Sequence, residues 1–133
     1  MKISGSEYAK LHSRLLKSSF RNRFHLNEAE KAYVYEKGIP AIEQHAEDIV
    51  RKRLVNPVKD GKQTPMKGHP VFIAQHATAT CCRGCIAKWH GISANALLTD
   101  DDIEYIISVI MLFIENEMKD YQPQVYGQLE LFL

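Results

Sequence analysis

The chain lacks a long hydrophobic run, a secretory signal and any large net charge. No apolar stretch approaches the roughly 18 to 20 residues that a membrane-spanning helix needs. The first residues, MKISGSEYAK, lack the apolar centre of a secretory signal. The formal net charge is only +1, so any surface for nucleic acid must be a local patch. We therefore expect no membrane partner and no polybasic surface over the whole molecule.

Cysteine is scarce. The three cysteines, Cys81, Cys82 and Cys85, lie within five positions of one another. An odd number of clustered cysteines does not form a disulfide framework. Such a cluster suits a reducing cytoplasm, where it binds a metal, takes part in catalysis or is buried. The sequence therefore predicts a cytoplasmic protein with one chemically distinctive segment.

The pattern of apolar residues and helix signals predicts an all-α fold. A length of 133 residues with 45% hydrophobic side chains is enough for a single small domain with its own core. We expect five or six helices in a helical domain over residues 1–119, followed by a flexible C-terminal tail over residues 120–133. The predicted helices are a first one that begins at Ser6 and others near residues 28–37, 40–54, 71–79, 82–90 and 100–119. A strand is the alternative for residues 71–79.

Two predicted helices begin with the same signal. Asn27 and Thr99 are each followed three residues later by an acidic residue, Glu30 and Asp102. This spacing is typical of a capping box, in which each side chain of the pair bonds the other residue's backbone N–H. The segment RNRFH, residues 21–25, is a predicted basic connector.

The longest predicted loop covers residues 55–70 and contains three prolines, two glycines and three lysines. A connection of about fifteen residues is longer than most structural ones, which favours a functional role. Its lysines, Lys59, Lys62 and Lys67, join Arg83 and Lys88 as the predicted nucleic-acid-binding residues.

The segment His69–Ile92 contains all three cysteines, three of the six histidines and the only tryptophan. Cys82 and Cys85 have the spacing of half a structural zinc site, so zinc is the predicted cofactor. The remaining ligands could come from His76, His90 or His69, and His76 and His90 are the predicted ones. His76 is favoured, because on a continuous helix His90 would lie about 7.5 Å along the axis from Cys85 and roughly 140° around it.

Two other interpretations of the cysteines remain open. Cys81, Cys85 and Trp89 have the spacing of the buried stripe of a short helix, which would need no chemistry. Alternatively, Cys82 near a helix start could be a thiolate nucleophile beside Arg83 and His76. Polar residues alternate here with alanine and glycine, which indicates either a polar site or a satisfied buried network.

The tail contains Gln128-Leu129-Glu130-Leu131-Phe132, which resembles the QLxLF peptide that binds the bacterial replication sliding clamp. The resemblance implies that Leu131 and Phe132 enter an apolar pocket on the clamp while Gln128 bonds at its edge. Leu129 is the remaining specified position. The alternatives are that the tail folds back on its own domain, or that two copies exchange tails as a dimer.

The segment HPVFIAQHATATCCRGCIAKWHGI, with GKQTPMKGHP before it, resembles a bacterial domain-of-unknown-function family over about residues 10–118. Some members carry a label that suggests an exodeoxyribonuclease subunit. This chain is too short for a helicase–nuclease subunit and has no GxxxxGK[ST] phosphate-binding loop. The resemblance implies no catalytic residue.

The sequence therefore predicts an accessory protein of DNA replication or repair that its tail recruits to the sliding clamp. The segment His69–Ile92 would face DNA or hold the metal. The alternatives are a metal- or cysteine-dependent hydrolase unrelated to DNA, and a structural module whose cysteines and histidines are buried core. Whether the protein is an enzyme stays open.

Overall fold

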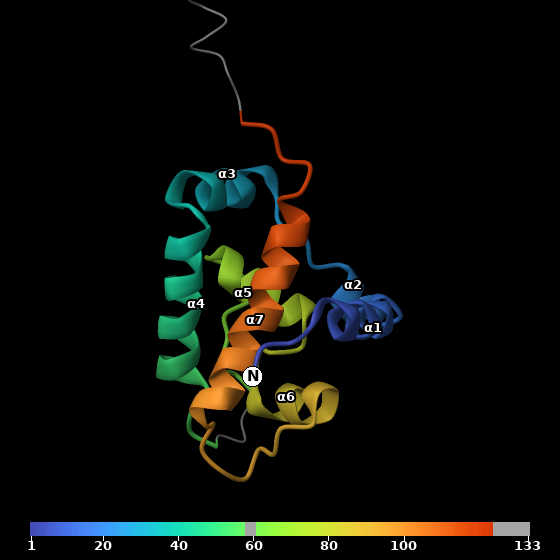
Figure 1. Ribbon diagram of the computed structural model, residues 1–133, viewed down its shortest axis with the longest axis vertical. Coiled ribbons are helices and arrows are strands. Elements are labelled where there is room, and N and C mark those ends of the chain that lie inside the picture. The colour runs from blue at the N-terminus through green and yellow to red at the C-terminus, as the bar shows by residue number, and fades with distance from the viewer. Residues whose placement is uncertain (58–60, 124–133) are drawn as a thin grey trace, which may run out of the picture.

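A computed structural model describes residues 1–57 and 61–123 of the chain. These ranges contain seven helices and no strand, which confirms the all-α prediction and excludes a strand at residues 71–79. Lys59 and the tail residues 124–133 lie outside the described ranges. The helices, labelled in Figure 1, are α1 (Gly5–Leu16), α2 (Ser19–Asn22), α3 (Glu28–Lys37), α4 (Ile39–Arg53), α5 (Pro70–Ala77), α6 (Arg83–His90) and α7 (Asp100–Glu117).

Both predicted capping boxes are present, at the starts of α3 and α7. The start of α1 differs from the prediction, because Ser4 and not Ser6 is its N-cap. Ser4 Oγ accepts the Glu7 N–H at 3.1 Å, and Glu7 Oε1 accepts the Ser4 N–H at 3.0 Å. Ser6 has Ala9 three residues later and cannot complete such a box.

Helix α2 was missed by the sequence analysis, which placed residues 21–25 in a connector. It is a single turn, and Ser18 caps it by accepting the Arg21 N–H at 3.1 Å. Four residues are too few to show a helical period, so periodicity cannot reveal such an element.

Helix α7 runs through the middle of the molecule, with α4 on one side and α5 against another face (Figure 1). Ile106, Ile110 and Ile114 on α7 are fully buried. Burial of each such side chain stabilises the fold by about 1.5 to 3 kcal/mol. Ile107 is only partly buried, whereas Val109 and Met111 are buried.

A second, smaller core cluster joins α1 to α7. Leu11 and Leu15 from α1 are buried there with Ala79 and Val109. Cys85 and Trp89 of α6 are partly buried and pack against the same cluster. The smaller cluster thus positions the cysteine segment together with the larger one, which contains Ile86 of α6.

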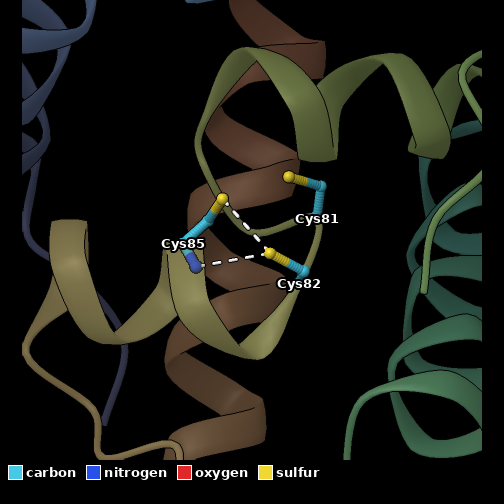
Figure 2. A group of neighbouring side chains, drawn as sticks. All are labelled: Cys81, Cys82 and Cys85. Atoms are coloured by element: carbon cyan, nitrogen blue, oxygen red, sulfur yellow. Dashed lines mark hydrogen bonds between the residues drawn. The ribbon is translucent and has the colours of Figure 1, made fainter. Parts of the chain in front are cut away.

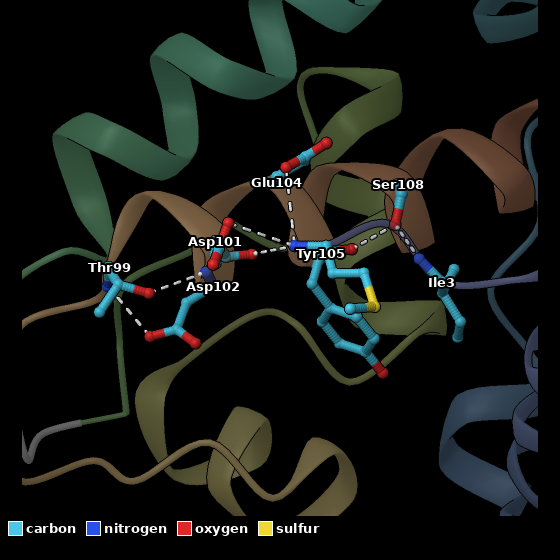
Figure 3. Close-up of polar contacts among 8 residues, drawn as sticks. Ile3, Thr99, Asp101, Asp102, Glu104, Tyr105 and Ser108 are labelled. Atoms are coloured by element: carbon cyan, nitrogen blue, oxygen red, sulfur yellow. Dashed lines mark hydrogen bonds and ion pairs between the residues drawn. The ribbon is translucent and has the colours of Figure 1, made fainter.

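The N-terminal segment also contacts α7, as Figure 3 shows. The Ile3 N–H donates to Ser108 Oγ at 3.0 Å, and the Ser108 hydroxyl donates to the Tyr105 carbonyl at 2.7 Å. The same view contains the capping box that Thr99 and Asp102 form at the start of α7. No helix in the described ranges combines the length and the apolar character that crossing a bilayer requires.

Candidate metal centre

The turn between α5 and α6 brings the three cysteines together. Its residues Thr78 to Cys82 are all buried. Ala79 has φ 58°, in the left-handed region that side chains other than glycine's seldom adopt. Such a conformation costs about 1 kcal/mol or more, so the surrounding packing must hold it. The backbone reversal at Ala79 directs Cys81 and Cys82 toward the first turn of α6.

The three thiols form one compact group, as Figure 2 shows. Their sulfur atoms all lie within 4.8 Å of one another. The Cys82 thiol donates to Cys85 Sγ at 3.2 Å. Cys82 is also the N-cap of α6, and its sulfur accepts the Cys85 N–H at 3.4 Å. Cys81 and Cys82 are buried, and Cys85 is partly exposed.

Arg21, from α2, contacts two of these sulfurs. Its Nη2 donates to Cys85 Sγ at 3.0 Å, and its Nη1 donates to Cys81 Sγ at 3.4 Å. Nη1 also donates to the His76 carbonyl at 2.8 Å. Arg21 as a whole residue is 8% exposed, so water screens its charge only weakly. A cation is therefore held in position against the thiols.

These contacts shift the pKa values of the three thiols in different directions. A hydrogen bond with Cys85, together with the Arg21 cation, lowers the pKa of Cys81 to about 7 against the opposing effect of burial. The same hydrogen bond and burial raise the pKa of Cys85, and burial raises the pKa of Cys82. Burial alone would lower the pKa of Arg21, but its contacts with Cys81 and Cys85 raise it. The group therefore favours one thiolate, on Cys81, beside a permanent cation.

Three thiols at this separation fit a metal ion. Thiolate sulfur is a ligand for soft and borderline metals, and sulfur atoms bound to one tetrahedral ion lie under 4 Å apart at metal–sulfur distances of about 2.3 Å. A divalent ion with three thiolates carries one net negative charge, which the Arg21 cation would neutralise. N–H donors to ligand sulfurs are the usual outer contacts of such centres. The described residues contain no other group of three cysteine, histidine or acidic ligands this close together.

His76 has the chemical form of a metal ligand, although its ring lies outside the group of thiols. Its Nε2 lies 2.9 Å from the Pro65 carbonyl, an acceptor, so Nε2 carries the proton. Its Nδ1 is buried and has no hydrogen-bond partner among the described residues. A ring nitrogen with a free lone pair, whose opposite N–H is bonded to a carbonyl, is the arrangement found in metal-bound histidine.

His90 does not lie with the thiols, and both of its ring nitrogens have partners. Nε2 donates to the Thr78 carbonyl at 2.8 Å, and Nδ1 accepts the Tyr105 hydroxyl at 2.8 Å. Its lone pair is therefore already engaged. His90 joins α6 to the preceding turn and to α7.

The buried-network interpretation also describes part of this segment. Thr78 Oγ1 donates to the Ala74 carbonyl at 2.7 Å and lies 3.0 Å from Thr80 Oγ1. The Gln75 side-chain amide donates to the Thr80 carbonyl at 3.2 Å. These polar side chains are fully buried and fix the turn rather than face solvent. The predicted stripe of Cys81, Cys85 and Trp89 is incomplete, because Cys81 precedes α6.

Arg83 cannot serve as the predicted nucleic-acid contact, because it is fully buried. Its guanidinium donates to four backbone carbonyls, those of Leu54, Val55, Ser93 and Ala96, at 2.6 to 3.2 Å. It joins the loop after α4 to the loop before α7. In the sequence, Arg83 resembles an ordinary surface cation. Only the structure reveals its buried role.

The remaining predicted nucleic-acid residues are dispersed. Lys62, Lys67 and Lys88 are exposed, with Lys88 on α6 and the other two in the loop before α5. Lys59 lies outside the described ranges. So do the predicted clamp-binding residues Gln128, Leu129, Leu131 and Phe132.

Sequence reasoning missed Arg21 and treated Cys81 only as core. Arg21 is 60 residues from Cys81 in the chain, and no local pattern connects them. Cys81 falls outside the CxxC spacing, although its position beside Cys82 was a signal for a third thiol.

A hollow lies elsewhere in the described part of the chain, between α4, α7 and the N-terminal segment. It has a volume of about 380 Å³ and apolar walls that include Ile107 and Met111. Carboxylates line it at five positions, Glu43, Glu47, Asp100, Glu104 and Glu115. It contains no thiol or histidine, so it offers no metal centre of the kind that the cysteines form.

A protein family described as "Domain of unknown function (DUF4186)" matches residues 9–115, most of the chain. No solved structure matches the chain significantly.

Proposed function

Because this chain belongs to the DUF4186 family, whose description names no activity, we propose its function from the chemistry of its own residues. The protein holds a zinc ion through the thiolates of Cys81, Cys82 and Cys85. The observation that carries this proposal is the separation of their three sulfur atoms, all within 4.8 Å of one another. The Arg21 guanidinium supports it by supplying the charge that three thiolates around a divalent ion require.

His76 is the fourth ligand in this proposal. Its unpartnered Nδ1 and its Nε2–H bond to Pro65 meet the chemical requirements. Its carbonyl and Cys81 Sγ share the Arg21 Nη1 donor, so the His76 backbone is next to the centre. The ring must move for Nδ1 to reach the ion. Four protein ligands would make the site a closed, structural one that fixes the turn before α6.

The test is metal analysis of protein purified without chelators. We expect about one zinc per chain, and we expect serine at Cys81, Cys82 or Cys85 to lower that content sharply. His76→Gln should weaken zinc binding, whereas His90→Gln should not, because the His90 lone pair is already engaged. Protein that contains no zinc and binds none when it is supplied would overturn the proposal.

Cobalt substitution gives a second measurement that does not depend on whether the variants fold. Co²⁺ in the wild-type protein should give the visible bands of a tetrahedral ion and a sulfur-to-metal charge-transfer band. A spectrum of octahedral Co²⁺ without charge transfer would show that the thiols do not bind the ion. The hydrolase alternative makes a different prediction, because a catalytic zinc keeps one position for water and the site would then not need His76.

We also propose a second role, recruitment to the replication sliding clamp through residues 128–132. The supporting observation is in the sequence, where Gln128, Leu129, Leu131 and Phe132 match every specified position of the QLxLF peptide. Six residues, 122–127, separate Gln128 from Tyr121, whose ring contacts Tyr35. Six residues span at most about 20 to 22 Å when extended, which is enough to reach a neighbouring protein. This role would place the protein in DNA replication or repair.

A further inference from the structure

A shallow pocket between α1 and α6 has a composition that differs from the rest of the surface. It is lined by Arg14, Lys17, Lys88 and Trp89 and has a volume of about 290 Å³. Arg14 and Lys17 come from the end of α1, and Lys88 and Trp89 come from the end of α6. Both helices lie on the same side of α7 in Figure 1. Residues more than 70 positions apart in the chain thus form one basic surface.

The three cations of this pocket are exposed and have no acidic partner. Arg14, Lys17 and Lys88 form no salt bridge with any residue in the described ranges, and no carboxylate lines the pocket. Like charges brought together without counter-charges repel one another, so an anion that binds there gains favourable interactions with all three. The acidic hollow between α4 and α7 would instead repel an anion.

Trp89 adds a feature that a simple anion site does not need. It is the only tryptophan in the chain. Its ring packs partly on the core cluster of Leu11, Leu15, Ala79 and Val109 and is partly exposed at the pocket. The Arg14 guanidinium lies over the ring, 5.3 Å from its centroid. The ring is therefore a held aromatic platform, and the exposed Arg14 side chain must swing away from this face before a base can stack on it.

We propose that this pocket binds single-stranded nucleic acid. One base stacks on the Trp89 indole, and Lys17, Lys88 and Arg14 contact the phosphates on either side of it. An aromatic platform beside a basic groove is the usual chemistry of proteins that bind single strands. Duplex DNA would not use the tryptophan, because its bases are already stacked on one another. An acidic protein would use the cations but has no need of an aromatic ring at their centre.

This inference rests on the proposed role in DNA replication or repair, because it specifies that the protein binds single-stranded nucleic acid in that role. Of the nucleic-acid-binding residues predicted from the sequence, only Lys88 lines this pocket. The two proposals can fail separately. Deletion of residues 128–133 should leave strand binding unchanged if the pocket is the binding surface.

The test uses the full-length protein and an unlabelled oligothymidylate of about 12 nucleotides. Because Trp89 is the only tryptophan, stacking of a base on it should quench the intrinsic fluorescence of the protein. Binding should weaken with salt, with a slope of log affinity against log salt near −2 for three phosphate contacts. Blunt duplex of the same length should bind more weakly and should not quench.

Variants locate the binding surface. Fluorescence anisotropy of a labelled oligonucleotide should show a loss of about tenfold or more for Lys17→Glu with Lys88→Glu. Trp89→Ala should lose about 5- to 160-fold, the range measured for stacking residues. The matched control is Lys52→Glu with Lys119→Glu, which makes the same charge change at exposed lysines outside the pocket. Circular dichroism checks that each variant is folded.

Three outcomes would overturn the inference. Equal losses in the pocket pair and the control pair would show that binding follows net charge alone. Binding of a polyglutamate peptide with the affinity of the oligonucleotide would show a general anion surface. Oligonucleotide binding without fluorescence quenching would show that no base reaches Trp89.

Discussion

Two buried arginines show how residues of one type take different roles. Arg21 is directed at sulfur atoms and Arg83 at backbone carbonyls. Each guanidinium is removed from water, which is costly unless its N–H groups are bonded. Arg83 is bonded to four carbonyls from two loops, so it maintains loop structure without any acidic partner.

Replacement of Arg83 should therefore be among the most damaging single changes. Arg83→Met keeps much of the side-chain volume but leaves four carbonyls without their donor. We expect a loss of unfolding free energy on the order of 3 kcal/mol or more, measured by urea denaturation. The matched control is Arg51→Met, which removes only exposed ion pairs with Glu47 and Asp100 and should cost under about 1 kcal/mol. Similar losses for both variants would contradict this account of Arg83.

The sequence predicted the starts of α3 and α7, but it assigned the N-cap of α1 to Ser6 instead of Ser4 and did not indicate the cap of α5. The boxes of α3 and α7 depend on residues three positions apart, so the sequence contains the whole signal. Helix α5 is capped instead by His69, whose Nδ1 accepts the Val71 N–H at 3.0 Å. Its Nε2 faces His45 Nδ1 at 3.1 Å, a partner on α4 that no local pattern indicates.

This cap makes the stability of the protein depend on pH. Burial, and then the proximity of His45, lowers the pKa of His69 from 6.5 to about 4. The unfolded chain therefore binds a proton more readily than the folded protein does. The contribution is fully present above pH 6.5 and is lost as the pH falls toward 4.

His69→Asn tests this contribution, because asparagine is a good N-cap that does not titrate. Between pH 6.5 and 4 the wild-type protein should lose on the order of 2 kcal/mol more unfolding free energy than the variant, allowing for partial solvent screening. Urea denaturation at several pH values measures the difference. Parallel curves for the two proteins would show that His69 is not the source.

At the scale of the whole molecule, the apolar core consists of two clusters that hold different helices together. The larger one joins α7 to α4 and α5 and needs no metal. The smaller one holds α1 and α6 together through Leu11, Leu15 and Trp89, beside the three thiols. The candidate metal centre and the basic pocket therefore both lie beside the smaller cluster.

In our proposal the tail binds the replication sliding clamp, and single substitutions in the tail test this role. Alanine at Gln128, Leu131 or Phe132 should abolish co-purification with the sliding clamp. Glu130→Ala is the matched control, because the peptide pattern leaves that position unspecified, and it should retain binding. The melting temperature should not change in any of these variants. A lower melting temperature for Leu131→Ala and Phe132→Ala would indicate instead that the tail packs on its own domain.

The sequence by itself determined the helical class, most helix positions, the capping boxes and the importance of the cysteine segment. These features depend on residues within a few positions of one another, where spacing and side-chain type suffice. Only the tertiary structure decided that Cys81 joins Cys82 and Cys85, that Arg21 donates to two of these sulfurs, that Arg83 is buried and that Trp89 lines a pocket with Arg14 and Lys17. Each of these contacts depends on how the chain reverses at Ala79 or how α1 and α2 pack on α7. Such packing is a sum of many weak contacts between distant residues, which no short pattern in the sequence records.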